Sequence, residues 1–70
     1  MTQNQIEELL QKAVSLHRAG QLRQAEAIYR QVLEIDQNHP DAWHLIGLVA
    51  YDLHDYQIAV RIFLKATELR

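Results

Sequence analysis

Four histidines are the residues of this chain whose type could support metal binding or proton transfer. A helical zinc site needs two ligands about one turn apart, but His39 and His44 are five residues apart, and His17 and His54 lie near the ends of different predicted helices. Adjacent side chains on a helix diverge, so His54 and Asp55 do not form a catalytic pair that a serine could join. The spacing therefore predicts no metal ligands and no catalytic histidine.

The other groups that could take part in chemistry are isolated as well. The lone hydroxyls are those of Thr2, Ser15 and Thr67. Glu8 with Lys12, and Glu26 with Arg30, have the four-residue spacing of ion pairs on a solvated helix face. The two glycines form no phosphate-binding loop, and without cysteine there is no thiolate chemistry. We therefore expect no enzyme active site and no cofactor.

Composition excludes further classes of partner. The formal net charge is -2, and the seven Lys and Arg residues are scattered without a basic run, which argues against a nucleic-acid surface. The first residues lack the features of a signal peptide, and the longest apolar run, residues 45–50, is too short to cross a bilayer. We expect a cytoplasmic chain with neither a nucleic-acid nor a membrane partner.

The elements that must position these side chains are helices. Apolar residues recur at helical spacing in four stretches, which predicts four helices. Gly20 ends the first helix because glycine adopts the left-handed conformation, and Pro40 suits the first turn of the third. Between the third and fourth helices, His54 is expected to adopt a positive φ and Asp55 to cap the fourth helix. Such short turns make neighbouring helices antiparallel.

The second half of the chain repeats the first with a shift of 34 residues. The shift relates Leu9 to Trp43, Ala13 to Gly47, Ala25 to Ala59, Ile28 to Ile62, and Tyr29 to Phe63. Glycine in a helix interior costs about 0.8 to 1.0 kcal/mol relative to alanine, so Gly47 must allow another helix to approach, with Trp43 filling the space one turn away. We expect alanine at position 47 to be tolerated and leucine to overpack.

These residues resemble the tetratricopeptide repeat, a 34-residue helix-turn-helix unit with the pattern W-x2-L-G-x2-Y, then A-x3-F, then Pro. The second unit reads Trp43, Ile46, Gly47, Ala50, Ala59, Phe63 and Ala66, and the first reads Leu9, Lys12, Ala13, Leu16, Ala25, Tyr29 and Val32. Lys12, Ala50 and His54 depart from the pattern. The resemblance implies an all-α fold in which four antiparallel helices form a short α-solenoid. Residues 1–70 would be one domain, with repeat 1 at about 6–39 and repeat 2 at about 40–70.

The resemblance also implies a protein or peptide partner, bound on a concave face lined by the first helix of each unit. The candidate contacts are Leu10, Val14, His17, Arg18, His44, Leu48, Tyr51 and Asp52. Family members that clamp a carboxylate have Lys and Asn on this face, where this chain has Leu10, Val14 and Leu45. An apolar or aromatic-bearing segment therefore fits better than a bare carboxylate. The alternative is that these residues only cover the surface or pack in an oligomer.

Two other functions are consistent with the sequence. The stretch from residue 19 to residue 51 resembles repeats that precede bacterial glycosyltransferase- or methyltransferase-like domains, so the chain could be the leading segment of a larger enzyme. It could also be a self-assembling unit, because no polar capping helix follows the fourth helix. Apolar residues that would face a third unit are Ile58, Ile62 and Leu69. We therefore expect a homo-oligomer formed through the fourth helix.

Overall fold

The computed structural model describes residues 2–69 and the side chains of residues 4–69, so the Thr2 hydroxyl and both chain ends lie outside the described part. Its elements are α1 (Thr2–Arg18), α2 (Leu22–Ile35), α3 (Pro40–Asp52) and α4 (Tyr56–Glu68). Turns of a few residues join them, and the described residues include no strand. The all-α prediction and the number of helices are confirmed.

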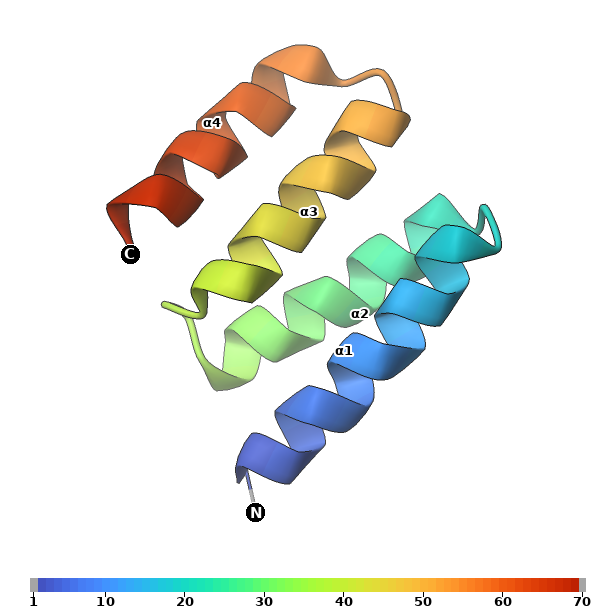
Figure 1. Cartoon of the computed structure of the whole chain (residues 1–70), viewed down its shortest axis with the longest axis vertical. Helices are drawn as coiled ribbons and strands as arrows, with labels where there is room; N and C mark the ends of the chain where they lie inside the picture. The colour runs from blue at the N-terminus through green and yellow to red at the C-terminus, as the bar shows by residue number, and fades with distance from the viewer. Residues whose placement is uncertain (1, 70) are drawn as a thin grey trace.

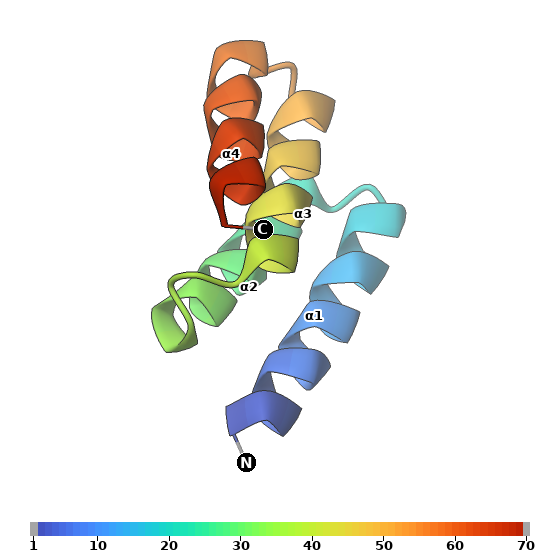
Figure 2. The ribbon, with the colours of Figure 1, turned by 60° about the vertical axis from the view of Figure 1, so that its left-hand side comes forward.

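The four helices form two antiparallel hairpins that pack side by side (Figure 1). Within the hairpins α1 packs on α2 and α3 on α4, and the contact between α2 and α3 joins them. Figures 1 and 2 both place α1 and α4 at opposite ends of the array. Short connections enforce this order because each helix must pack against the next one along the chain.

The helix boundaries follow local chemistry at the turns. Gly20 has a φ of 82° and His54 a φ of 67°, so both adopt the left-handed conformation that the sequence predicts for them. At the start of α3, Nδ1 of His39 accepts a hydrogen bond from the backbone N–H of Ala42 at 3.1 Å. The prediction for Asp55 is half right: it occupies the N-cap position of α4, but its side chain makes no capping hydrogen bond.

Two clusters of buried side chains form the core, and both contain residues from both hairpins. The larger cluster comprises Ala13, Ala25, Ile28, Tyr29, Ile46 and Val49. The smaller comprises Ile6, Val32 and Ala42. The hairpins therefore share one continuous apolar core, as expected for stacked repeat units that do not bury their apolar faces alone.

Gly47 marks a close approach between α3 and α4, as predicted. A Cβ atom at this position would lie 2.5 Å from Cε1 and 2.7 Å from Cδ1 of Phe63. Alanine, which the sequence predicts to be tolerated here, would require the Phe63 ring to move; its tolerance stays a prediction. Trp43, one turn away, donates its indole N–H to the carbonyl oxygen of Gln37 at 2.8 Å, which ties the loop between the hairpins to α3.

Candidate peptide-binding face

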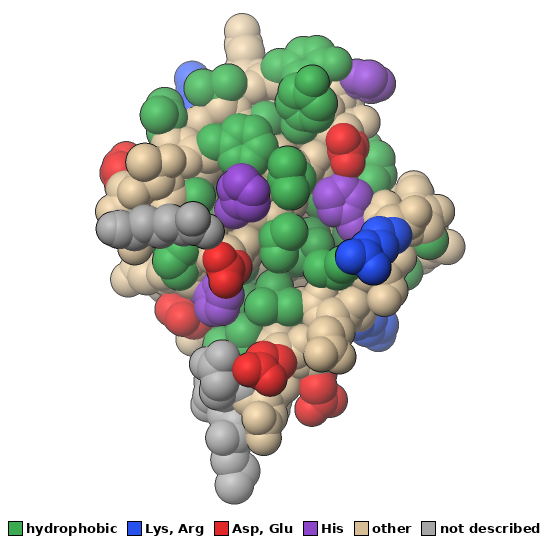
Figure 3. Space-filling view, viewed as in Figure 1, with side chains coloured by type: hydrophobic (Ala, Val, Ile, Leu, Met, Phe, Trp, Pro, Cys, Tyr) green, Lys and Arg blue, Asp and Glu red, His purple; other side chains and the backbone are tan. Residues whose placement is uncertain are grey.

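The predicted contact residues occupy equivalent positions in the two repeats, four on α1 and four on α3. The equivalent pairs are Leu10 and His44, Val14 and Leu48, His17 and Tyr51, and Arg18 and Asp52. We call these eight residues the α1–α3 face. In the view of Figure 3, hydrophobic side chains gather around histidines in the middle of the surface.

A hydrogen bond between His17 and Asp52 joins the two helices of this face. Nε2 of His17 lies 2.6 Å from Oδ2 of Asp52, and their side chains are 18% and 47% exposed. Each residue lies in the last turn of its helix, so the contact bridges α1 and α3 at one end of the face. Because the two side chains hydrogen-bond to each other, they are less available to a partner than the sequence suggests.

The apolar part of the face is half-buried. Leu10 and Val14 pack against the larger core cluster and line a shallow hollow along α1 of about 420 Å³. The side chains of Gln11, Ser15 and Arg18 complete this hollow. The arrangement offers a partner an apolar floor with polar and cationic edges, the usual composition of a site that binds an amphipathic segment.

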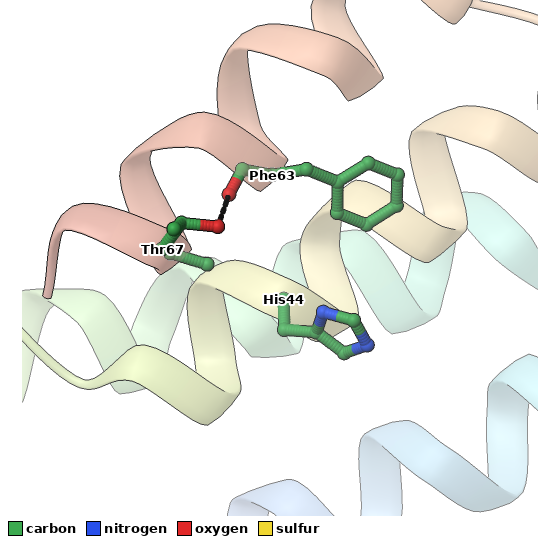
Figure 4. Close-up of a pocket in the computed structure, with 4 residues that line it drawn as sticks. His44, Phe63 and Thr67 are labelled. Carbon is green, nitrogen blue, oxygen red and sulfur yellow. Dashed lines mark hydrogen bonds between the residues drawn. The ribbon is translucent and has the colours of Figure 1, made fainter. Parts of the chain in front are cut away.

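His44 belongs to a different depression. Its ring lies 5.5 Å from the ring of Phe63, centroid to centroid, with a tilt of 45°. Both residues line a pocket of about 330 Å³ between α3 and α4, together with Ala66 and Thr67 (Figure 4). The Thr67 hydroxyl donates to the Phe63 carbonyl oxygen at 3.0 Å, so its hydrogen-bonding capacity is used within α4. His44 therefore contributes an exposed ring that packs near Phe63.

Tyr51 is part of an exposed aromatic cluster at the turn between α3 and α4. Its side chain is 55% exposed, and its ring meets that of Tyr56 edge to face at 5.2 Å. The Tyr56 hydroxyl is hydrogen-bonded to Nδ1 of His54 at 2.7 Å. Sequence reasoning missed Tyr56 and His54 as neighbours of the face, although a three-residue connection after α3 places them beside Tyr51.

The predicted face thus has three parts. His17 and Asp52 form a bridge, Leu10 and Val14 form an apolar floor, and His44 and Tyr51 each contact an aromatic ring of α4. The hollow along α1 includes Leu10, Val14 and Arg18, whereas His44 lines the pocket between α3 and α4. Leu48, half-buried on α3, lies one turn before Tyr51 on the same face.

The charged side chains of the described residues form one of the two ion pairs that their spacing suggests. Glu26 and Arg30 form an ion pair at 3.5 Å, whereas the described side chains of Glu8 and Lys12 do not form one. Within the described residues no three His, Cys, Asp or Glu side chains come together to hold a metal ion. None of the described helices has both the length and the apolar character needed to cross a membrane.

Tyr29 carries a buried polar group that the sequence did not point to. Its side chain is fully buried in the larger core cluster, and its hydroxyl oxygen has no hydrogen-bond partner. Burial raises the pKa of Tyr29 above its ordinary value of 10.0, because the charged phenolate is poorly solvated there. The equivalent residue of the second unit is Phe63, which has no hydroxyl.

The α4 residues predicted to mediate self-association have neighbours in the first hairpin. Ile62 packs against the larger core cluster, and Ile58 and Ile62 line a hollow that also contains Arg23 and Arg30 of α2. Their role in self-association stays a prediction. Leu69, the third predicted residue, is half-buried just after α4.

Comparison with known proteins gives two family matches. One family model described as tetratricopeptide repeat matches residues 6–49, and a second with the same description matches residues 40–70. The two matches overlap over residues 40–49, which lie in α3, the first helix of the second hairpin. No curated protein matches the chain.

Proposed function

Because the chain belongs to the tetratricopeptide repeat family, we propose that it is a protein-interaction scaffold that binds a segment of a partner protein on the α1–α3 face. The observation that carries this proposal is that exposed Tyr51 lies next to half-buried Leu48 on α3, the first helix of the second repeat. Tyrosine is enriched in protein interfaces, where it supplies apolar area and a hydrogen-bonding group.

The chemistry of the face favours a partner segment with apolar or aromatic side chains. Leu10 and Val14 form its floor, and neither can hold a carboxylate. His17 is engaged by Asp52, which leaves Arg18 as the cation at the edge of the α1 hollow. An amphipathic segment would bury apolar side chains on this floor and place an acidic or polar group near Arg18.

The proposal is tested with the purified chain and an array of peptides that carry apolar, aromatic or acidic C-terminal residues. We expect the apolar and aromatic peptides to be retained, and Leu48→Ser/Tyr51→Ser to weaken their binding about tenfold or more, as loss of an interface hot spot would. Ile35→Ser is the matched control, because Ile35 is also an exposed large hydrophobic residue but lies at the end of α2. Equal binding by the parent chain and the double variant would contradict the proposal.

We also propose that the chain self-associates through α4. Of the six large hydrophobic residues that are exposed among the described residues, four lie on this helix. Three of these, Tyr56, Val60 and Leu64, share one side of it, whereas the fourth, Ile58, lines the hollow toward α2. Apolar residues gathered on one exposed element mark an interaction surface. This role does not involve the α1–α3 face and can be tested separately.

A further inference from the structure

Three of the exposed residues of α4 share one side of the helix. Tyr56, Val60 and Leu64 are spaced four residues apart, so their side chains form a stripe, and they are 50%, 56% and 59% exposed. Half-buried Phe63 lies beside this stripe at the pocket that it shares with His44. We call Tyr56, Val60, Phe63 and Leu64 the free face of α4.

The first repeat carries charges at the two most exposed of these positions. A shift of 34 residues relates Glu26 to Val60 and Arg30 to Leu64. Glu26 and Arg30 form an ion pair at 3.5 Å on the surface of α2. The second repeat thus replaces a solvated ion pair with two aliphatic side chains that the described chain leaves exposed, which points to a surface that another molecule covers.

The opposite end of the array is polar. Three α3 residues that share core clusters with the first hairpin have exposed polar equivalents on α1. The equivalent pairs are Ala42 and Glu8, Ile46 and Lys12, and Val49 and Ser15. The outer side of α1 therefore lacks the apolar residues with which α3 covers α2. A head-to-tail stack of copies would bury Glu8 and Lys12 against apolar side chains without partners, which is costly.

We propose that the free face of α4 binds the same face of a second copy, so that the two α4 helices pack around a two-fold axis. This inference rests on the proposed self-association and assigns its surface and its symmetry. A two-fold axis brings like surfaces together, which suits a chain with one apolar end and one polar end.

The size of the free face predicts a weak dimer. Taking about 200 Å² for a large side chain, the half-exposed residues offer roughly 400 Å² of apolar surface per copy. Standard stable interfaces bury about 800 Å² per partner, so this face alone would give a weak, transient association. Dimers would thus form at high concentration and dissociate on dilution.

Sedimentation equilibrium over a dilution series tests the proposal. The double variant Val60→Glu/Leu64→Arg gives the second repeat the same ion pair that Glu26 and Arg30 form in the first. We expect the fold to be retained, because the first repeat accommodates this pair on the surface of α2. We expect the dimer of this variant to have a dissociation constant at least about tenfold higher than that of the parent, because the variant loses central interface residues. Ile58→Glu is the matched control on the other side of α4, and its dissociation constant should stay within about twofold of the parent value.

Disulfide trapping gives a second measurement that does not depend on the charged variant folding. The chain has no cysteine, so Leu64→Cys introduces a single thiol close to the proposed two-fold axis. We expect oxidation to give a covalent dimer from Leu64→Cys and much less from Ile58→Cys.

The outcomes separate this inference from the self-association on which it rests. A parent chain that stays monomeric throughout the series overturns both. A dimer that Ile58→Glu abolishes and Val60→Glu/Leu64→Arg leaves intact keeps self-association but overturns the free face as its surface. Mass that grows beyond the dimer with concentration overturns the two-fold arrangement.

Discussion

The contact between Gly47 and Phe63 allows a quantitative test of how closely α3 and α4 approach. In Gly47→Ala the added methyl carbon would start 2.5 Å from a ring carbon of Phe63, well inside the 3.4 Å at which ordinary contact begins. The ring must therefore shift by about 1 Å, and Phe63 is half-buried between α3 and α4.

Two opposing effects set the expected size of the change in the free energy of unfolding. Replacing glycine by alanine in a helix interior gains about 0.8 to 1.0 kcal/mol, whereas overpacking costs about 1 to 3 kcal/mol. We expect Gly47→Ala to destabilise the chain by about 1 kcal/mol, which lowers Tm by about 4 to 8 °C in a domain of this size. Gly47→Leu adds three more carbons to the same space and should cost more.

A double-mutant cycle with Phe63→Leu separates the steric effect from helix propensity. Without the ring, Gly47→Ala should stabilise the chain by roughly the propensity difference, so the sign of the effect reverses between the two backgrounds. Ala27→Gly, at an exposed position inside α2, measures that propensity difference in this chain. If Gly47→Ala in the parent raises Tm by as much as Ala27→Gly lowers it, the close approach described here is refuted.

Substitutions at four further residues test other parts of the structure by urea unfolding. Tyr29→Phe should stabilise the chain by about 1 kcal/mol, since it removes a buried hydroxyl without a partner; an unchanged or lower midpoint would contradict this. Burial raises the pKa of Tyr29, so the folded state keeps a proton that the unfolded state loses, and the parent should lose stability above about pH 10 more steeply than Tyr29→Phe. His39→Ala should cost about 0.5 to 2 kcal/mol through loss of the α3 cap, whereas His39→Asn should restore the cap. His17→Ala and Asp52→Ala should lower stability by similar amounts, and the double variant by less than their sum, because the two residues share one hydrogen bond; additive effects would show that this bond contributes nothing.

The sequence predicted the helices because their signals are local. Apolar periodicity, the positive φ of Gly20 and His54, and proline at the start of α3 each depend on a few neighbouring residues. The shift of 34 residues predicts which helices pair. The small residue at position 47 predicts the close approach that the contact with Phe63 shows. These features depend on backbone conformation and residue size, which spacing along the chain records directly.

The neighbours of individual side chains are harder to predict than the helices. The ring of His44, which the sequence places on the α1–α3 face, lies 5.5 Å from the ring of Phe63, a contact that the spacing does not reveal. Ile62 packs against the larger core cluster, which the spacing does not reveal either. Spacing identifies the side of a helix to within about one position, and the angle between two helices decides which neighbour that side meets. Comparing the repeats position by position would have identified Val60 and Leu64, because Glu26 and Arg30 stand at the equivalent sites.

The repeat relation also explains why equivalent residues differ in burial. Tyr29 and Phe63 occupy the same position in their hairpins, yet Tyr29 is fully buried and Phe63 is only half-buried. Tyr29 shares its core cluster with Ile46 and Val49 of α3, which cover it from the next unit along the array. The difference in exposure between Tyr29 and Phe63 therefore shows how much the next unit buries, and no described residue covers Phe63 in the same way. The free face of α4 and the apolar floor on α1 lie on helices at opposite ends of the array, so self-association and peptide binding, as proposed, do not compete for the same surface.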